Sequence, residues 1–124
     1  MRVLVTGANG FIGKNLVVRL HELDIHVEVY TRKNSIQDLL DLVKKVDCIV
    51  HLAGENRPVD EKYFNIVNAG LTVSIFEAVR STGKHVPIVL ASSTQAVLDN
   101  AYGKSKLDAE MTAKRFESDT GNPT

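Results

Sequence analysis

Hydrophobic positions along the chain follow two patterns in alternation. Short runs rich in β-branched and aliphatic residues predict strands at 2–6, 26–31, 46–52 and 86–91. The segments after these runs carry apolar residues at steps of three and four, which predicts helices at 11–23, 36–43, 60–80 and 102–118. Strands that alternate with helices in this way predict a parallel sheet with right-handed crossovers, which is a doubly wound α/β fold.

Local signals refine this prediction. The runs at 46–52 and 86–91 are nearly continuous in apolar residues, as expected for strands that are covered on both faces. Ser35 predicts an N-cap for the second helix, and Gly121 predicts a stop for the last one. Only about 15 residues separate the second strand from the third, room for a single helix, so we expect a sheet that is short at one edge.

Composition narrows the possible functions. The chain has 124 residues, which suits one domain, and 44% of them are hydrophobic, so a core can form. Lys and Arg together number 15, as do Asp and Glu, and no like-charged block points to a nucleic acid or a membrane surface. The single cysteine, Cys48, lies in a predicted strand, where we expect it to pack rather than react. Without a targeting segment or a membrane-length apolar run, we expect a soluble cytoplasmic domain.

Three glycines stand between the first strand and the first helix in the spacing G-x-x-G-x-x-G: Gly7, Gly10 and Gly13. Glycine lets the turn bend and lets the backbone approach a diphosphate, while the last glycine lets the helix pack on the sheet. The helix N-terminus adds free N–H groups and the positive end of its dipole. The turn therefore predicts a Rossmann-type dinucleotide site, and a tight turn without a ligand is the alternative. Further candidate contacts within the turn are Asn9, Phe11 and Ile12.

The end of the second predicted strand indicates which dinucleotide binds. In NAD-binding domains an acidic residue about 20 positions after the glycines binds the ribose 2′-hydroxyl. Arg32 and Lys33 occupy that place here, and a guanidinium suits the 2′-phosphate of NADP. We therefore expect NADP(H) rather than NAD(H), bound by Arg32. Two alternatives stay open, namely a solvated basic loop and Glu28 as an acidic ribose ligand.

A tyrosine and a lysine four positions apart are the candidates for proton transfer. Tyr102 and Lys106 share one face of the last predicted helix. A cation about 4 Å from a phenol stabilises its phenolate by about 4 kcal/mol at an effective dielectric near 20, which suits acid–base chemistry at neutral pH. Thr94 follows the fourth predicted strand, at the edge where open α/β sheets bind ligands. A surface tyrosine beside a solvated lysine is the alternative reading.

Together these motifs resemble the extended short-chain dehydrogenase/reductases, the NAD-dependent epimerase/dehydratase family. The matching segments occur in the family's order: 6–13, 51–54, Asn68, 92–94 and 102–106. More narrowly, segments 51–58, 92–96 and 99–106 resemble the reductases of capsular polysaccharide synthesis. The resemblance spans residues 1–124 but matches only the N-terminal, NADP-binding part of such an enzyme.

The resemblance implies NADPH-dependent reduction of the C4 keto group of a UDP-linked 4-keto-6-deoxy amino sugar. Tyr102 would protonate the C4 oxygen, Lys106 would assist it, and Thr94 would hydrogen-bond the carbonyl, with Ser93 as the alternative hydroxyl. The resemblance assigns further cofactor contacts to Leu52, Ala53, Gly54, Asn68, Tyr102 and Lys106. A solvent-facing Asn68 and a plain polar loop at Asn56 and Arg57 remain alternatives, and His51 is expected to pack at a strand end.

Other activities of the family fit the residues less well. Dehydratases of this type carry Asp-Glu where this chain has Gln95 and Ala96, which favours reduction over elimination. A 4-epimerase that holds NAD is the nearest enzymatic alternative, and Arg32 argues against it. An NADP-binding regulator without chemistry is the alternative of another class, but such proteins tend to lose the tyrosine and lysine.

The resemblance also raises expectations about assembly. The helices at about 60–81 and 102–119 would form a homodimer interface. The last strands of the sheet and the substrate-binding part are expected to be missing, so residues 1–124 alone should bind NADP(H) weakly and show little turnover. The exposed sheet edge should then invite association.

Overall fold

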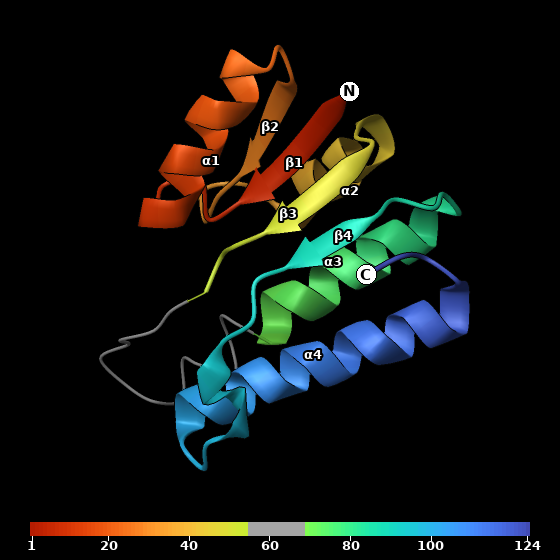
Figure 1. The fold of residues 1–124 in the computed structure, drawn as a ribbon. Helices are drawn as coiled ribbons and strands as arrows, with labels where there is room; N and C mark the ends of the chain where they lie inside the picture. Colours follow the sequence, from red (N-terminus) through yellow and green to blue (C-terminus); the bar gives the residue numbers. More distant parts are fainter. Residues whose placement is uncertain (55–68) are drawn as a thin grey trace.

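The computed structural model describes residues 1–54 and 69–124, and it confirms the predicted alternation of strands and helices (Figure 1). The strands are β1 (Arg2–Thr6), β2 (His26–Tyr30), β3 (Cys48–His51) and β4 (Ile88–Leu90). The helices are α1 (Phe11–Glu22), α2 (Ile36–Lys45), α3 (Gly70–Thr82) and α4 (Ala101–Thr120), with a short 3-10 helix η2 (Thr94–Val97). The sequence pattern did not predict η2, and residues 60–68 of the third expected helix lie outside the described residues.

All strand pairs are parallel, and the order across the sheet is β2-β1-β3-β4. Val5 on β1 pairs with Val29 on β2 at one side and with Val50 on β3 at the other. The chain therefore runs outward from β1 to β2, crosses over, and continues on the other side. This order confirms the doubly wound α/β class, and it creates a switch point between the carboxyl ends of β1 and β3.

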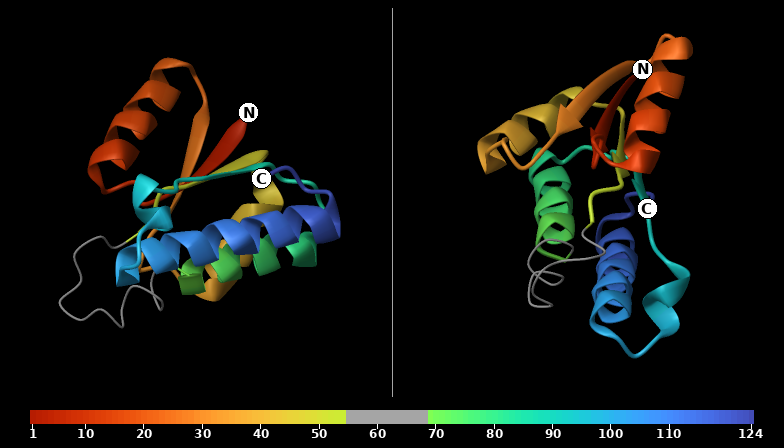
Figure 2. Two further views of the ribbon diagram at one scale, coloured as in Figure 1. Left: turned by 60° about the horizontal axis from the view of Figure 1, so that its bottom comes forward. Right: turned by 90° about the vertical axis from the view of Figure 1, so that its left-hand side faces the viewer.

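Figure 2 shows α1 on one side of the sheet and the helices α2, α3 and α4 on the other. The larger core lies beneath these three helices, where Phe76 of α3 stacks on Phe116 of α4 with ring centroids 4.7 Å apart. The smaller core lies beneath α1 and contains Val3 and Val5 of β1. Successive residues in the middle of β1 thus point into opposite cores, since Leu4 lies in the larger core and Val3 and Val5 lie in the smaller one, which explains why residues 3–5 are all apolar.

Helix ends follow the local sequence. Ser35 caps α2 in a reciprocal capping box, since its hydroxyl accepts from Asp38 N at 3.1 Å and the Asp38 carboxylate accepts from Ser35 N at 2.7 Å. Asn100 caps α4 through Gly103 N at 2.7 Å. Gly121 ends α4 in the left-handed conformation with φ of 70°. The predicted cap and stop are therefore confirmed.

The expectation that β4 is covered on both faces is wrong. Val89 points away from α3 and α4 and is 55% exposed, because α1 covers the other end of the sheet and no described helix lies over β4 on that face. Cys48 on β3 is half-buried in the smaller core, and burial raises the pKa of its thiol, as expected for a packing residue. Within the described residues, no helix combines the length and apolarity that spanning a membrane requires.

Candidate functional site

The glycine turn between β1 and α1 is built on two very close backbone contacts. Gly7 has φ of +73°, and a Cβ on it would lie 2.6 Å from Ala53 N, so the turn touches the chain that leaves β3. A Cβ on Gly13 would lie 2.1 Å from Gly7 O, because the first turn of α1 packs directly on the glycine turn. Neither position accepts a side chain without a backbone shift.

The first turn of α1 offers hydrogen-bond donors. Gly10 is the N-cap and provides no side chain, and no acidic residue lies in the first turn. The first intrahelical bond runs from Lys14 N to Gly10 O, so the preceding N–H groups have no acceptor within the helix. These donors and the positive end of the helix dipole suit an anionic group such as a diphosphate.

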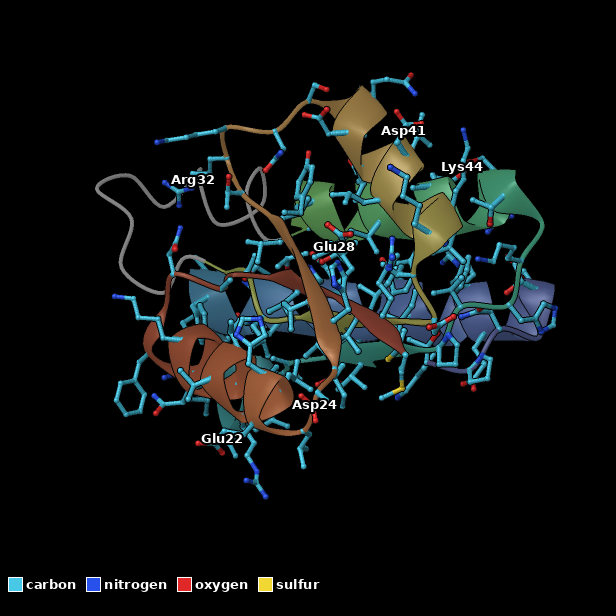
Figure 3. The ribbon with its side chains drawn as sticks, turned by 90° about the horizontal axis from the view of Figure 1, so that it is seen from above. Glu22, Asp24, Glu28, Arg32, Asp41 and Lys44 are labelled. Atoms are coloured by element: carbon cyan, nitrogen blue, oxygen red, sulfur yellow. The ribbon has the colours of Figure 1, made fainter. Side chains whose placement is uncertain are left out.

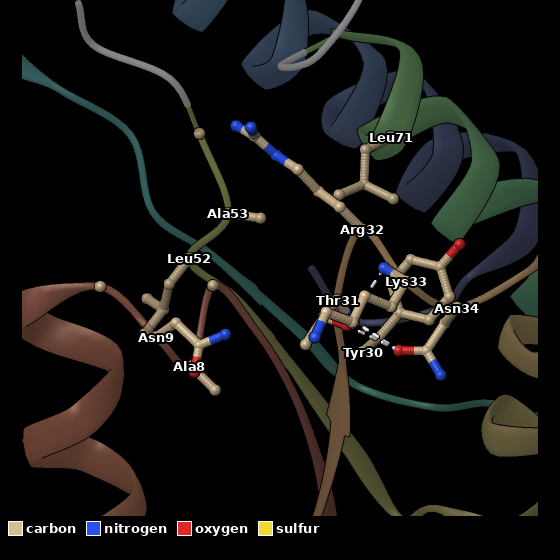
Figure 4. A pocket seen from close by; sticks show the side chains of 13 residues that line it. Ala8, Asn9, Tyr30, Thr31, Arg32, Lys33, Asn34, Leu52, Ala53 and Leu71 are labelled. Carbon is tan, nitrogen blue, oxygen red and sulfur yellow. Dashed lines mark hydrogen bonds between the residues drawn. The ribbon is translucent and has the colours of Figure 1, made fainter.

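A groove of about 830 Å³ opens beside this turn (Figure 4). It lies at the carboxyl ends of β1, β2 and β3, with the start of α3 on its far side. Its walls are Gly7, Ala8, Asn9, Gly10, Tyr30, Thr31, Arg32, Lys33, Asn34, Leu52, Ala53, Gly54 and Leu71. The groove therefore sits at the switch point of the sheet, where ligands of such folds bind.

Arg32 reaches this groove from an ordered turn. Asn34 Oδ1 accepts hydrogen bonds from Thr31 N at 2.8 Å and from Thr31 Oγ1 at 3.0 Å, which fixes the backbone on either side of Arg32. Figure 3 shows Arg32 beyond the end of β2 and Glu28 in the middle of the strand. Glu28 forms an ion pair there with Arg2 at 3.7 Å, and its Oε1 lies 3.2 Å from His26 Nε2. Glu28 is therefore not an acidic ligand at the groove, and that alternative is wrong.

Tyr102 and Lys106 form a second cluster, on the first turns of α4. Lys106 is only 8% exposed, and its Nζ donates to Ala91 O at 3.1 Å, just after β4. The same Nζ lies 5.8 Å from the centroid of the Tyr102 ring. Burial lowers the pKa of the Lys106 ammonium. Lys106 is thus a buried, hydrogen-bonded cation beside a tyrosine, and the alternative of a solvated lysine is wrong.

Gly103 brings this cluster against η2. A Cβ on Gly103 would lie 2.2 Å from Gln95 O and 2.6 Å from Leu98 O, so α4 packs on the η2 backbone without a spacer. Thr94, the first residue of η2, is exposed, whereas the Ser93 hydroxyl caps η2 by accepting from Gln95 N at 3.2 Å. Figure 1 shows η2 and the start of α4 beyond the carboxyl end of β4, the same edge of the sheet as the groove.

A profile of the NAD dependent epimerase/dehydratase family matches residues 3–122. The chain belongs to this family. Over 99% of its length, it is 48% identical to a UDP-2-acetamido-2,6-beta-L-arabino-hexul-4-ose reductase of Pseudomonas aeruginosa, and it covers 33% of that protein. The chain thus spans about a third of the length of this relative.

Solved structures agree with the assignment to the epimerase/dehydratase family. The capsular polysaccharide assembling protein CapF of Staphylococcus aureus is 37% identical and superposes with a TM-score of 0.84, over 99% of this chain and 34% of CapF. MoeE5, solved with UDP-glucuronic acid and NAD, is 25% identical with a TM-score of 0.80, over 95% of this chain and 50% of MoeE5. A nicotinamide dinucleotide site is therefore a family property.

In this member of the epimerase/dehydratase family, the groove collects most of the residues predicted to bind the cofactor: Gly7, Asn9, Gly10, Arg32, Leu52, Ala53 and Gly54. Gly13 packs against the backbone of the glycine turn. Phe11 and Ile12 are exposed at the start of α1, outside the groove lining. Thr94, Tyr102 and Lys106 lie apart from the groove walls. Predicted positions that lie outside the described residues are Asn56, Arg57 and Asn68.

Sequence reasoning missed a buried polar chain beneath the groove. His51 is 2% exposed, and its Nδ1 lies 2.6 Å from Thr6 Oγ1 while its Nε2 lies 3.0 Å from Thr72 Oγ1. Thr6 Oγ1 also accepts from Ala53 N at 3.1 Å. His51 does pack at a strand end, as expected, but through hydrogen bonds. The available signal was one polar residue at the carboxyl end of each of two strands, directly after the apolar residues 3–5 and 48–50.

The burial of His51 predicts a pH dependence of stability. Burial, followed by the Lys106 charge, lowers the pKa of His51 from 6.5 to about 4. The unfolded chain therefore binds a proton on His51 below pH 6.5, which the folded chain resists until about pH 4. The contribution of neutral His51 to the unfolding free energy is fully present above pH 6.5. Acidification reduces the unfolding free energy, by about 3 kcal/mol at pH 4.

Urea unfolding at a series of pH values measures this effect. The slope of unfolding free energy between pH 6.5 and pH 4 should be shallower in His51→Gln than in the wild type. His21 is exposed on α1, and His21→Gln is the matched control that should retain the wild-type slope. Equal slopes in the His51 variant and the wild type would contradict the prediction.

Proposed function

We propose that residues 1–124 are the NADP-binding domain of a reductase that converts the C4 keto group of a UDP-linked 4-keto-6-deoxy amino sugar to an alcohol, in capsular or O-antigen polysaccharide synthesis. The observation that carries the proposal is the Tyr102–Lys106 pair, held at the groove edge of the sheet. The 48% identity to a UDP-hexulose reductase and the likeness to CapF support this substrate class.

The groove fits a dinucleotide on physical grounds. The absence of side chains at Gly7 and Gly10 lets a diphosphate approach the backbone closely, and the first turn of α1 contributes its unused donors and dipole. Leu52 and Ala53 supply apolar walls beside the glycine turn, and Leu71 supplies one on the far side. NADPH bound here would supply the hydride for carbonyl reduction.

The chain's own groups would handle the proton and the developing charge. Tyr102 would donate its hydroxyl proton to the C4 oxygen as the carbonyl becomes an alkoxide. Lys106 would stabilise the tyrosinate that remains, and its buried contact with Ala91 O holds it in place for this. Thr94 is exposed at the same edge and would donate a hydrogen bond to the C4 oxygen, whereas the Ser93 hydroxyl already caps η2.

Oxidation of NADPH in the presence of such a UDP-4-keto sugar tests the proposal, using protein made from the complete reading frame. UDP-glucuronic acid is the matched control, since it has no keto group for NADPH to reduce. Turnover with the keto sugar and none with UDP-glucuronic acid is expected. Equal turnover with both, or with neither, would reject the proposed reaction.

Arg32→Ser should weaken NADPH binding by about tenfold to a hundredfold and leave NADH binding nearly unchanged. The expected loss is that of a charge-assisted hydrogen bond to the 2′-phosphate, which NADH lacks. Calorimetric titration with both dinucleotides measures it. Arg19→Ser is the matched control, because Arg19 is an exposed arginine that pairs with Glu22 at 2.9 Å, far along α1 from the glycine turn. A parallel loss of NADPH and NADH affinity in Arg32→Ser would argue against NADP specificity.

We further propose that α3 and α4 pair with the same helices of a second copy. The two helices lie side by side (Figure 2), and each exposes apolar side chains, Val73 on α3 and Leu107 and Met111 on α4. Exposed apolar side chains on neighbouring helices favour burial against a partner. A mass of one chain by light scattering would contradict the proposed dimer.

A further inference from the structure

We propose that the hydrogen-bonded chain Thr6–His51–Thr72 is a positioning device that fixes the walls of the dinucleotide groove relative to one another, and that His51 serves in it as a neutral imidazole with its proton on Nε2. The proposal rests on the proposed function only for dinucleotide binding, and not for the sugar. It assigns a role to three residues that the glycine turn and the Tyr102–Lys106 pair leave unexplained.

The three residues lie directly behind three different walls of the groove. Thr6 is the last residue of β1 and precedes Gly7, and His51 is the last residue of β3 and precedes Leu52. Thr72 lies in α3 and follows Leu71. The hydrogen-bonded chain therefore connects β1, β3 and α3, the three elements that meet at the switch point. Longer or shorter hydrogen bonds would change the distances between these groove walls.

The direction of the hydrogen bonds determines the tautomer. Thr6 Oγ1 accepts from Ala53 N at 3.1 Å, and its other hydrogen-bond partner is His51 Nδ1 at 2.6 Å. The Thr6 hydroxyl proton therefore points to Nδ1, which acts as the acceptor. A neutral imidazole then carries its proton on Nε2 and donates it to Thr72 Oγ1 at 3.0 Å.

Burial raises the free-energy cost of breaking the hydrogen-bonded chain. Thr6, His51 and Thr72 are 0%, 2% and 1% exposed. Water therefore does not take the place of a lost hydrogen-bond partner, and the unsatisfied polar group destabilises the fold. Burial also keeps the pKa of His51 low, which preserves the neutral form. A proton on Nδ1 would turn the acceptor facing Thr6 into a donor and would break the sequence of donors that begins at Ala53 N.

Thr72→Val tests the device, since valine keeps the shape of threonine and removes the acceptor for Nε2–H. The NADPH dissociation constant should rise about tenfold, as for an unsatisfied buried donor. Thr72→Ser restores the hydroxyl and should recover most of this loss. Thr82→Val is the matched control: Thr82 ends the same helix, and its hydroxyl donates to Val79 O at 2.7 Å, so NADPH affinity should stay at the wild-type value.

Thermal unfolding of the same variants separates positioning from mere stability. A lower melting temperature in Thr72→Val with an unchanged NADPH dissociation constant would overturn the proposal, as would equal losses in Thr72→Val and Thr82→Val. Wild-type protein that binds neither NADPH nor NADH would overturn it too. Wild-type protein that binds NADPH but leaves the keto sugar unreduced rejects only the proposed reaction, because the variants still report on groove positioning.

Nitrogen NMR of the wild-type imidazole provides a test that needs no variant. His51 should show a protonated Nε2 and an unprotonated Nδ1 at neutral pH, with a fixed tautomer rather than an exchanging mixture. A proton on Nδ1 would overturn the assignment.

Discussion

Tyr102→Phe is expected to lower kcat for keto-sugar reduction by about a hundredfold or more, the usual effect of removing a general acid. Phenylalanine keeps the ring that lies 5.8 Å from Lys106 Nζ, so the cation keeps its aromatic neighbour and its contact with Ala91 O. The substitution removes the hydroxyl group that carries the transferable proton, so the loss in kcat should far exceed any loss of NADPH affinity. Steady-state assays with the complete protein and calorimetric titration measure the two quantities.

Two lysines on the same helix provide the matched control. Lys106→Met removes the buried cation and should lower kcat as well, because the tyrosinate loses its stabilising charge. Lys104 is exposed and pairs with Asp99 at 2.7 Å, so Lys104→Met should leave the rate unchanged. A wild-type rate in Tyr102→Phe would reject the assignment of Tyr102 as the acid.

Gly13→Ala is expected to produce the largest loss of stability among single-methyl changes. Its Cβ would lie 2.1 Å from Gly7 O and 2.7 Å from the Cα of Ala8, so α1 must move away from the turn. Overpacking of backbone against backbone has no side-chain rotamer to relieve it, and we expect a loss of about 3 kcal/mol or more in unfolding free energy. NADPH binding should weaken in parallel, because the same movement displaces the N–H donors.

Gly70→Ala is the control for this substitution. A Cβ on Gly70, the first residue of α3, meets nothing within 4 Å among the residues that the structure describes, and alanine favours a helix by up to about 1 kcal/mol. Urea unfolding should therefore show no loss for Gly70→Ala. Similar stability of the two variants would mean that the contact between α1 and the glycine turn is not a constraint.

The local sequence predicted most of the backbone. The four apolar runs became the four parallel strands. Ser35 begins α2 through its capping hydroxyl, and Gly121 ends α4 through its left-handed backbone conformation. These features depend on residues that are close together in the sequence, so the sequence pattern is sufficient to predict them. The sequence pattern did not predict the short helix η2, because its four residues show no periodicity. Its backbone packs against Gly103 of α4, which follows it in the sequence.

The candidate site divides in the same way. The glycine spacing predicted a ligand-binding turn, and Arg32 was expected at its rim, where the groove includes it. Whether Glu28 could compete depended on strand register, and β2 places it in the interior of the strand beside Arg2. Thr72 had no recognisable motif, because its partner His51 is 21 residues away and meets it only across α3 and β3.

By itself the sequence determined the class of fold, the glycine turn and the residue types needed for proton transfer, because each is written in spacing along a single segment. Tertiary structure decided which face of the sheet stays open over Val89, how closely α4 meets η2, and that Thr6, His51 and Thr72 join behind the groove. These outcomes depend on distances between segments far apart in the chain. Such distances are set by the packing of helices on the sheet, which no local pattern specifies.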